Sequence, residues 1–191
     1  ELTEEKNFNL LVEAKMGVTD EKKSKAYLRG ETCQGIYLNF QNVLNSTRQK
    51  IPFGIAQIGK AFRNEITPKN FIFRTREFEQ MEMQFFIEPK EKEADKFFEY
   101  WKEQRLNWYL NLGIDKKNLR FRAHAEDELV HYAKAAEDIE YNTSFGGWKE
   151  FEGVHNRGDW DLSRHSEYSG KNLGYLEQDG TRVTPWIIET S

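Results

Sequence analysis

The sequence predicts an α+β fold in which helices pack on, or are inserted between, the strands of an antiparallel sheet. Two observations predict it: strand-like runs of period two flank a turn-forming segment, and two longer stretches have the apolar spacing of helices. The chain has 191 residues, which suits one domain or the greater part of one and can bury a sizeable core.

The first elements surround a proline. Residues 34–48 place Ile36, Phe40 and Val43 on one stripe, which predicts a helix. Pro52 then precedes the strand-like run "FGIAQIGKAF". The turn-forming "TPKN" separates this run from a second strand-like segment, so we expect an antiparallel hairpin with a longer loop.

The later elements alternate in type. Residues 91–112 form an amphipathic pattern that predicts a helix, and a second helix is predicted from Glu126 to about Ile139. The segments "WKEFEGV" and "TRVTPWIIETS" are typical of strands, and the last one should be largely buried.

Composition narrows the function class. The net charge of −4 gives no general attraction for nucleic acid, so any such contact needs a local patch. No apolar run approaches the ~20 residues of a membrane span, and the first residues lack a signal-peptide pattern. One cysteine and four scattered histidines match no zinc or disulfide pattern. We expect a cytoplasmic protein without zinc, an organic cofactor or a membrane contact.

The hairpin carries an unusual mixture of charged and aromatic residues. A period of two puts Arg74, Phe78 and Glu82 on one face of the second strand. If Arg63 and Glu65 of the first strand face the same side, the surface suits a ligand with phosphate, a flat base and an ammonium group. The alternative is a cross-strand salt-bridge ladder on a solvated face, with the phenylalanines in the core. The pattern alone leaves both open.

Three other residues also have structural interpretations. Glu31 could be a carboxylate favoured at the N-terminus of the first helix, or a ligand-binding group, or both. Cys33 is expected to be a small buried residue without chemistry. Arg157 in "NRGDWD" could pair with Asp159 or Asp161 in a turn.

Several ordered segments resemble one enzyme family. "FRNEITPKNFIFRTREFEQMEMQFF" closely resembles motif 2 of class II aminoacyl-tRNA synthetases, in the form of the single-chain, homodimeric glycyl-tRNA synthetases. "AYLRGETCQGIYLNFQNVLNSTRQKIPFGIAQIGKAFRNE" resembles the run leading into motif 2. "EFEGVHNRGDWDLSRHSE" resembles a later substrate loop, and "PWIIETS" the strand entering motif 3. Similar residues extend from about Phe8 to Ser191.

The resemblance implies a class II catalytic core, an antiparallel sheet flanked by helices, with motif 2 at about 54–87 and a mainly helical insertion at about 91–143. It implies glycine–tRNA ligase activity: glycine and ATP with Mg²⁺ give glycyl-adenylate, and the glycyl group passes to the 3′ end of the glycine tRNA. Two alternatives stay open, an inactive synthetase-like paralogue and a tRNA-independent adenylating ligase. Joint retention of the motif 2 arginines and carboxylates argues against the paralogue.

The resemblance also implies residue roles. Arg63 would hold the α-phosphate and be the main catalytic residue, Glu65 would meet the adenine amino group, Arg74 the outer phosphates, and Phe78 would stack on adenine. Glu150 could help to hold Mg²⁺. The implied ATP-binding set is Arg63, Asn64, Glu65, Phe73, Arg74, Thr75, Arg76, Glu77, Phe78, Glu150 and Phe151. The implied glycine-binding set is Glu31, Phe78, Gln80, Glu82, Arg157, Glu189 and Ser191.

The chain departs from the family pattern in two places and in extent. Gly30 stands where the family usually has proline, which loosens the loop that carries Glu31, and Cys33 stands where it has alanine. Motif 1 is expected before Glu1, and motif 3 and the anticodon-binding domain after Ser191. We therefore expect the isolated chain to make little or no glycyl-adenylate and to associate through uncovered apolar surface, whereas the complete protein should be a homodimer.

Overall fold

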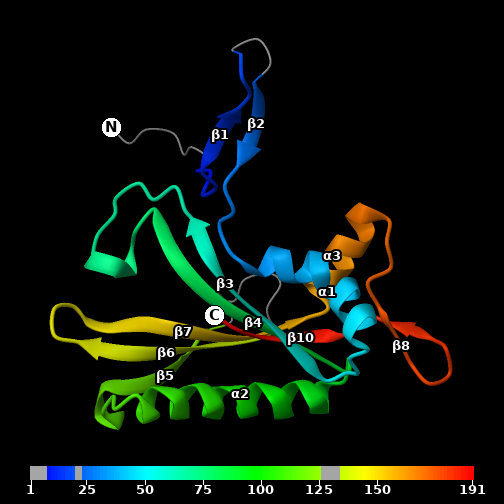
Figure 1. The fold of residues 1–191 in the computed structure, drawn as a ribbon. Helices are drawn as coiled ribbons and strands as arrows, with labels where there is room; N and C mark the ends of the chain where they lie inside the picture. The colour runs from blue at the N-terminus through cyan, green and yellow to red at the C-terminus, as the bar shows by residue number, and fades with distance from the viewer. Residues whose placement is uncertain (1–7, 20–22, 126–133) are drawn as a thin grey trace. The chain divides into compact units, whose positions relative to one another are not determined.

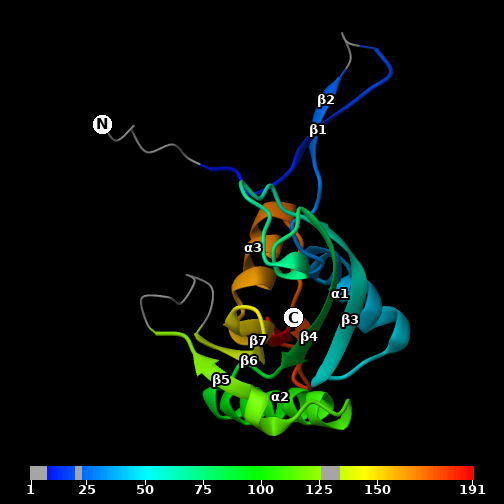
Figure 2. The same ribbon diagram turned by 90° about the vertical axis from the view of Figure 1, so that its left-hand side faces the viewer.

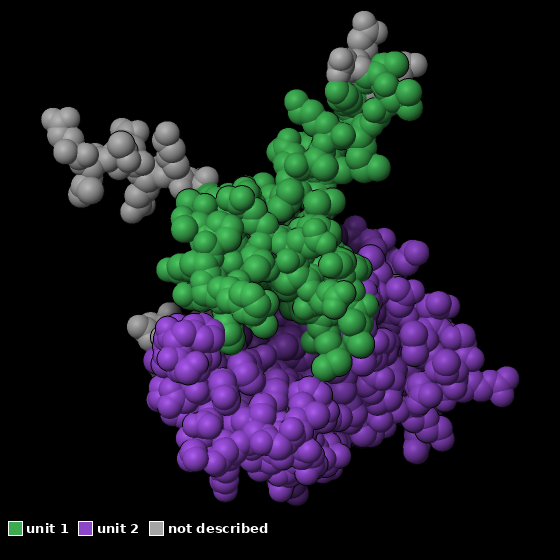
Figure 3. All heavy atoms as spheres, turned by 60° about the vertical axis from the view of Figure 1, so that its left-hand side comes forward, with its two compact units in different colours: residues 1–32, 58–81 green, residues 33–57, 82–191 purple. Residues whose placement is uncertain are grey.

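The computed structural model describes residues 8–19, 23–125 and 134–191. The chain divides into two compact units, one of residues 1–32 and 58–81 and the other of residues 33–57 and 82–191 (Figure 3). We describe each unit by itself. Among the described residues, no helix is long and apolar enough to cross a membrane.

The first unit contains a small hairpin and the far end of a larger one. Strands β1 (Glu13–Met16) and β2 (Ser24–Tyr27) pair antiparallel as a separate two-stranded sheet (Figure 1). The unit also includes one end of β3 (Phe53–Phe62), the short 3₁₀ helix η2 (Phe71–Phe73) and the start of β4 (Glu77–Ile87). Nothing in the sequence pattern predicted the β1–β2 hairpin.

The second unit is built on a six-stranded sheet with the order β3-β4-β10-β7-β6-β5. Strand β10 (Trp186–Thr190) lies between β4 and β7 (Gly147–Gly158), antiparallel to both. Strands β6 (Ala135–Thr143) and β5 (Leu119–Ala123) extend the sheet by antiparallel pairing. The remaining elements are α1 (Cys33–Thr47), α2 (Glu91–Asn111), η3 (Lys116–Asn118), α3 (Trp160–Ser169), β8 (Tyr175–Leu176) and β9 (Arg182–Val183).

The helices cover opposite faces of this sheet because neighbouring strand residues alternate in direction. Phe86 and Ile187 pack with Phe40 and Tyr37 of α1, whereas the next residues, Ile87 and Ile188, pack with Ala94 and Phe98 of α2. Figures 1 and 2 show α2 lying along one face of the sheet, with α1 and α3 on the other. A further apolar cluster joins the end of α2 to β5 and β6.

Most elements lie where the sequence pattern placed them. Helix α1, strand β3 and helix α2 match their predicted ranges to within one residue at each end. The predicted strands at 148–154 and 181–191 correspond to β7 and to β9 with β10, and β10 is largely buried as expected.

The predicted helix from Glu126 to about Ile139 is wrong where it can be compared. Residues 126–133 lie outside the described residues, and residues 135–139 belong to strand β6. The reason is visible in the alternation: Glu137 and Ile139 face α2, whereas Asp138 faces away from it. Strand pairing on both sides of β6 therefore overrides the helical propensity of "AAED". In the stretch 91–143, described helix is limited to α2 and η3, and β5 and β6 follow.

A β-bulge in β7 decides which side chains share a face. Ile139 pairs with Glu152 and Glu140 with Glu150, so Phe151 is an extra residue. Phe151 and Glu152 consequently both contact Tyr109 of α2. Glu150 before the bulge and His155 and Arg157 after it have their side chains on the opposite face.

Candidate active site

In the first unit, the side chains at the start of β4 point alternately to two faces of the strand, as the sequence predicted. Phe78 and Gln80 are half-buried, whereas Glu77, Glu79 and Met81 are exposed. The guanidinium carbon of Arg63 lies 5.2 Å from the centre of the Phe78 ring. Arg63 also donates from Nε to the Gly30 carbonyl at 3.2 Å. Arg63 and Phe78 therefore share one face, as the binding interpretation requires.

The other hairpin residues divide into two groups. Arg74 and Glu65 form a long ion pair, with Arg74 Nε 3.8 Å from Glu65 Oε2, and the Arg74 side chain is about half exposed. Arg76 instead holds the turn, because its Nε donates to the Glu65 carbonyl at 2.9 Å. The Asn64 side-chain amide donates to the backbone carbonyl of Asn9 at 3.2 Å, and the Thr75 hydroxyl donates to the backbone carbonyl of Glu77 at 2.9 Å. The Glu77 carboxylate forms an ion pair with Lys60 at 3.0 Å. Two ion pairs of the alternative salt-bridge ladder are therefore present, Lys60 with Glu77 and Arg74 with Glu65. Arg63 is not part of this ladder, since its guanidinium lies over the Phe78 ring.

The segment that ends the first stretch of this unit is tied to β4. The Thr32 amide donates to Gln80 Oε1 at 3.2 Å. Glu31 is half-buried immediately before Thr32. Phe73 is half-buried in η2, and so is not the fully buried strand residue that the alternative interpretation assumed.

In the second unit, neighbouring strands bring polar residues together on the face away from α2. Glu189 of β10 lies directly opposite Gln84 of β4 and His155 of β7. Gln84 Nε2 donates to Glu189 Oε1 at 2.7 Å, and His155 Nδ1 lies 3.0 Å from Glu189 Oε2. Ser191 exchanges backbone hydrogen bonds with Gly153 at 2.8 and 3.1 Å, which carries β10 past this cluster.

Arg157 joins this cluster to helix α3. Its Nε and one Nη donate to the two oxygens of Asp161 at 2.7 and 2.9 Å, and its other Nη donates to Glu189 Oε2 at 2.9 Å. All three side chains are at most 5% exposed. Arg157 does pair with Asp161, but the pair spans the end of β7 and α3 and is buried, unlike a solvated turn. Burial alone would lower the pKa of Arg157, yet the two carboxylates raise it above its ordinary value.

The bulge in β7 places the side chains of two predicted ATP-binding residues, Glu150 and Phe151, on opposite faces of the sheet. The Phe151 ring stacks on Tyr141 with centres 4.8 Å apart and also contacts Tyr109, so its side chain belongs to the α2 face. Any contact of Phe151 with ATP would therefore use its backbone. Glu150 is exposed on the other face, directly opposite Glu140.

Comparison with known proteins decides the family. The model of the class II tRNA synthetase core domain (G, H, P, S and T) matches residues 12–191. The chain belongs to this family. The predicted class II core fold is therefore confirmed, and a solved structure agrees. Giardia lamblia prolyl-tRNA synthetase in complex with prolyl-adenylate superposes with a TM-score of 0.69 at 18% identity, over 95% of this chain and 34% of that one.

Curated relatives of this class II core are more similar in sequence. A glycine–tRNA ligase of Treponema denticola is 56% identical over 193 residues, which cover 100% of this chain and 42% of the relative. The glycine–tRNA ligase of Streptomyces coelicolor is 55% identical over 190 residues, covering 98% of this chain and 41% of the relative. The chain spans about two fifths of the length of these relatives.

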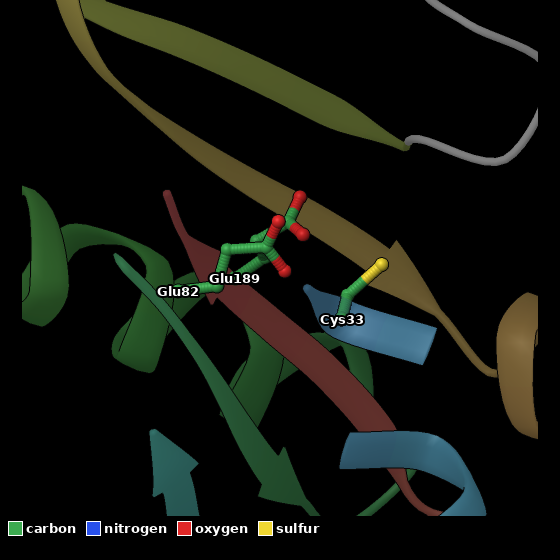
Figure 4. A group of neighbouring side chains, drawn as sticks. All are labelled: Cys33, Glu82 and Glu189. Atoms are coloured by element: carbon green, nitrogen blue, oxygen red, sulfur yellow. The ribbon is translucent and has the colours of Figure 1, made fainter. Parts of the chain in front are cut away.

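Within the part of the chain that the structure describes, one group of side chains could hold a cation. Ligand atoms of Cys33, Glu82 and Glu189 lie within 4.8 Å of one another, and all three residues are buried (Figure 4). A thiol with two carboxylates could coordinate a divalent metal. However, Glu189 already accepts from Gln84 and Arg157, so the same group also suits an ammonium ion, which needs hydrogen-bond acceptors and negative charge.

Some residues of this cluster were missed by the sequence analysis. Asp161 was named only as one of two turn partners, and His155 and Tyr37 were not considered as site residues. The sequence offered only the closeness of Asp161 to Arg157 along the chain, because Arg157 belongs to β7 and Asp161 to α3 and no regular helical spacing connects them. No local pattern marks Tyr37, because it continues the apolar stripe of α1.

The ionised state of Glu189 gives a first testable prediction. Burial raises the pKa of this carboxyl, but the close approach of His155, the Arg157 charge and the Gln84 amide outweigh it and lower the pKa from 4.5 to about 2. The resulting stabilisation is present above the unfolded-state pKa and is lost as pH falls toward about 2. A lowering of this size corresponds to roughly 3 kcal/mol.

We expect Glu189→Gln to flatten the dependence of the unfolding free energy on pH between about 4.5 and 2. Urea unfolding at several pH values measures this dependence. Glu167→Gln, which changes an exposed residue of α3, is the control and should leave the curve unchanged. An unaltered pH dependence in the Glu189 variant would contradict the assignment.

Proposed function

We propose that this chain provides the catalytic core of a glycine–tRNA ligase that is cytoplasmic and homodimeric in its complete form. The observation that carries the proposal is the match of the whole chain, at 56% identity, to a protein with that name. The Glu82–Glu189 cluster supports it, because a buried pair of carboxylates offers negative charge and hydrogen-bond acceptors to an ammonium group.

The adenylate-forming step proposed for this core needs no acid–base pair. The glycine carboxylate, already ionised at neutral pH, attacks the α-phosphorus of ATP, and the bond to the bridging oxygen breaks so that pyrophosphate leaves with the electron pair. Arg63 provides charge and hydrogen bonds to the phosphate oxygens, Phe78 provides a stacking surface, and Arg74 meets the outer phosphates. In the second step, a ribose hydroxyl of the tRNA attacks the glycyl carbonyl and forms an ester, the bond from this carbon to the phosphate oxygen breaks, and AMP leaves with the electron pair while the hydroxyl proton passes to a phosphate oxygen or to water.

Mg²⁺ would accompany ATP in this reaction and neutralise phosphate charge. Glu150 is the residue proposed to help hold it. The exposed carboxylate of Glu150 is a kind of ligand that Mg²⁺ prefers, whereas Glu140, directly opposite, already accepts a hydrogen bond from Arg120 at 2.6 Å.

ATP–pyrophosphate exchange on the complete protein, with each amino acid in turn, tests the proposal. We expect exchange with glycine alone, followed by transfer of labelled glycine to the glycine tRNA. The absence of exchange with any amino acid would favour the inactive paralogue. Glycine-dependent exchange without transfer to tRNA would favour a tRNA-independent ligase.

Glu82 provides a second prediction. Glu82→Gln removes one negative charge facing the proposed ammonium site, so the glycine dissociation constant should rise by roughly 10-fold or more, in keeping with loss of a charge-assisted hydrogen bond. Affinity for ATP should change little. Isothermal titration calorimetry measures both. Glu79→Gln, on the exposed face of the same strand, should affect neither, and an equal loss of both affinities in the Glu82 variant would refute its assignment to glycine.

A further inference from the structure

We infer that Tyr37 is a positioning residue for the proposed glycine site, because its hydroxyl fixes the Gln84 amide that holds the Glu189 carboxylate. The inference rests on the proposed function. Tyr37 Oη donates to Gln84 Oε1 at 3.0 Å, and Gln84 Nε2 donates to Glu189 Oε1 at 2.7 Å. Tyr37 and Gln84 are fully buried and Glu189 is 4% exposed.

The direction of this relay follows from the chemistry of its members. An ionised carboxylate accepts hydrogen bonds and donates none, so Gln84 must turn its nitrogen toward Glu189. Its oxygen then needs a donor, and the Tyr37 hydroxyl supplies one. Burial raises the pKa of Tyr37 well above its ordinary value, which keeps the hydroxyl protonated as a donor. Each group therefore permits a single orientation of the next.

The orientation of Glu189 matters because most of its acceptor capacity is already used. A carboxylate offers about four lone-pair positions. Gln84 uses one on Oε1, while Arg157 and His155 both lie against Oε2. About one position remains for an N–H of the substrate ammonium. The Gln84 contact on one oxygen and the Arg157 contact on the other fix the carboxylate plane, and so fix where that last position points.

Removing the Tyr37 hydroxyl would leave Gln84 Oε1 as a buried acceptor without its donor. The amide would lose the contact that fixes its plane, and the Glu189 carboxylate would lose a fixed partner on one side. The bond from Gln84 is also among the interactions that keep Glu189 ionised. Glycine affinity should fall, whereas ATP affinity and the rate of the chemical step at saturating glycine should change little.

A purely structural role for the hydroxyl is the competing explanation, since Tyr37 belongs to the core cluster with Ile36 and Phe40. The second unit contains a matched control for it. Tyr109 is also a buried tyrosine whose hydroxyl donates to a buried carboxylate, Glu152, at 2.9 Å. Tyr109 belongs to α2 and lies away from the Glu189 cluster, so Tyr109→Phe removes a buried tyrosine hydrogen bond, here one to a charged acceptor, without touching the relay.

The test compares Tyr37→Phe, Gln84→Met, their double variant and Tyr109→Phe in the complete protein. Titration calorimetry gives the glycine dissociation constant, and pyrophosphate exchange gives KM and kcat. We expect Tyr37→Phe to raise the glycine dissociation constant and KM about fivefold, the effect of one neutral hydrogen bond, with kcat and the KM for ATP within about twofold. Gln84→Met should raise them about tenfold or more, because its amide bonds to a charged group. Tyr109→Phe should change neither.

The double variant tests whether the hydroxyl acts through the amide. If it does, adding Tyr37→Phe to Gln84→Met should raise the glycine dissociation constant by less than about twofold further. Unchanged glycine binding in Tyr37→Phe, fully multiplicative effects in the double variant, or an equal effect of Tyr109→Phe would each overturn the inference. Because Tyr37→Phe removes a single oxygen, melting curves should confirm a folded protein. If the unaltered protein shows no glycine-dependent exchange, the proposed function fails, and the glycine role of Tyr37 fails with it.

Discussion

Replacing Arg157 by methionine should lower the free energy of unfolding by about 3–5 kcal/mol, the largest stability effect that we expect from a single substitution here. Arg157 is the guanidinium that bonds to both Asp161 and Glu189, and these carboxylates are 2% and 4% exposed. Methionine fills much of the same volume but leaves two buried negative charges without their partner. The loss should appear as a lower urea midpoint at neutral pH.

Two further variants separate uncompensated charge from lost packing. Combining Arg157→Met with Asp161→Asn and Glu189→Gln removes all three charges, and should recover a substantial part of the stability. Arg164→Met breaks the exposed pair with Glu167 on α3 and should change the midpoint little. A small effect of Arg157→Met, or a triple variant less stable than the single one, would show that the buried charges are not what Arg157 stabilises.

The sequence could predict elements whose own residues determine their geometry. The apolar stripe of α1 and the strand-like run after Pro52 define a helix and a strand with little ambiguity. The period of two along β4 also predicted correctly that Phe78 and Glu82 share one face of the strand. These features depend on local spacing, so a single sequence carries them.

What the sequence could not predict depends on pairing between distant segments. Strand β6 was taken for a helix because its residues tolerate either structure, and its place between β5 and β7 decides the outcome. The bulge that turns Phe151 toward α2 follows from the β6–β7 register, which has no local signal. The contact of Tyr37 with Gln84 joins residues 47 positions apart, so it emerges only once α1 packs on the sheet.

The proposed catalytic role of Arg63 rests on local geometry in the first unit. Its guanidinium lies over the Phe78 ring, and its Nε donates to the Gly30 carbonyl. These two contacts use the ring-facing surface and one N–H of the side chain. The two terminal nitrogens of the guanidinium are then oriented as a planar fork, which is the geometry that binds two phosphate oxygens at once.

We therefore expect Arg63→Ala to lower the single-turnover rate of glycyl-adenylate formation by roughly 100-fold or more, as for loss of one preorganised donor. Arg63→Lys should restore little, because an ammonium group has no second parallel donor, no planar face for Phe78 and no equivalent of Nε to bond to Gly30. Lys60→Ala, which removes a cation paired with Glu77 on the exposed side of the hairpin, should leave the rate unchanged. Rapid-quench measurement with saturating ATP and glycine compares the variants. A lysine variant with a rate near that of the unaltered protein would show that Arg63 contributes positive charge alone, and that the fork geometry has no part in the reaction.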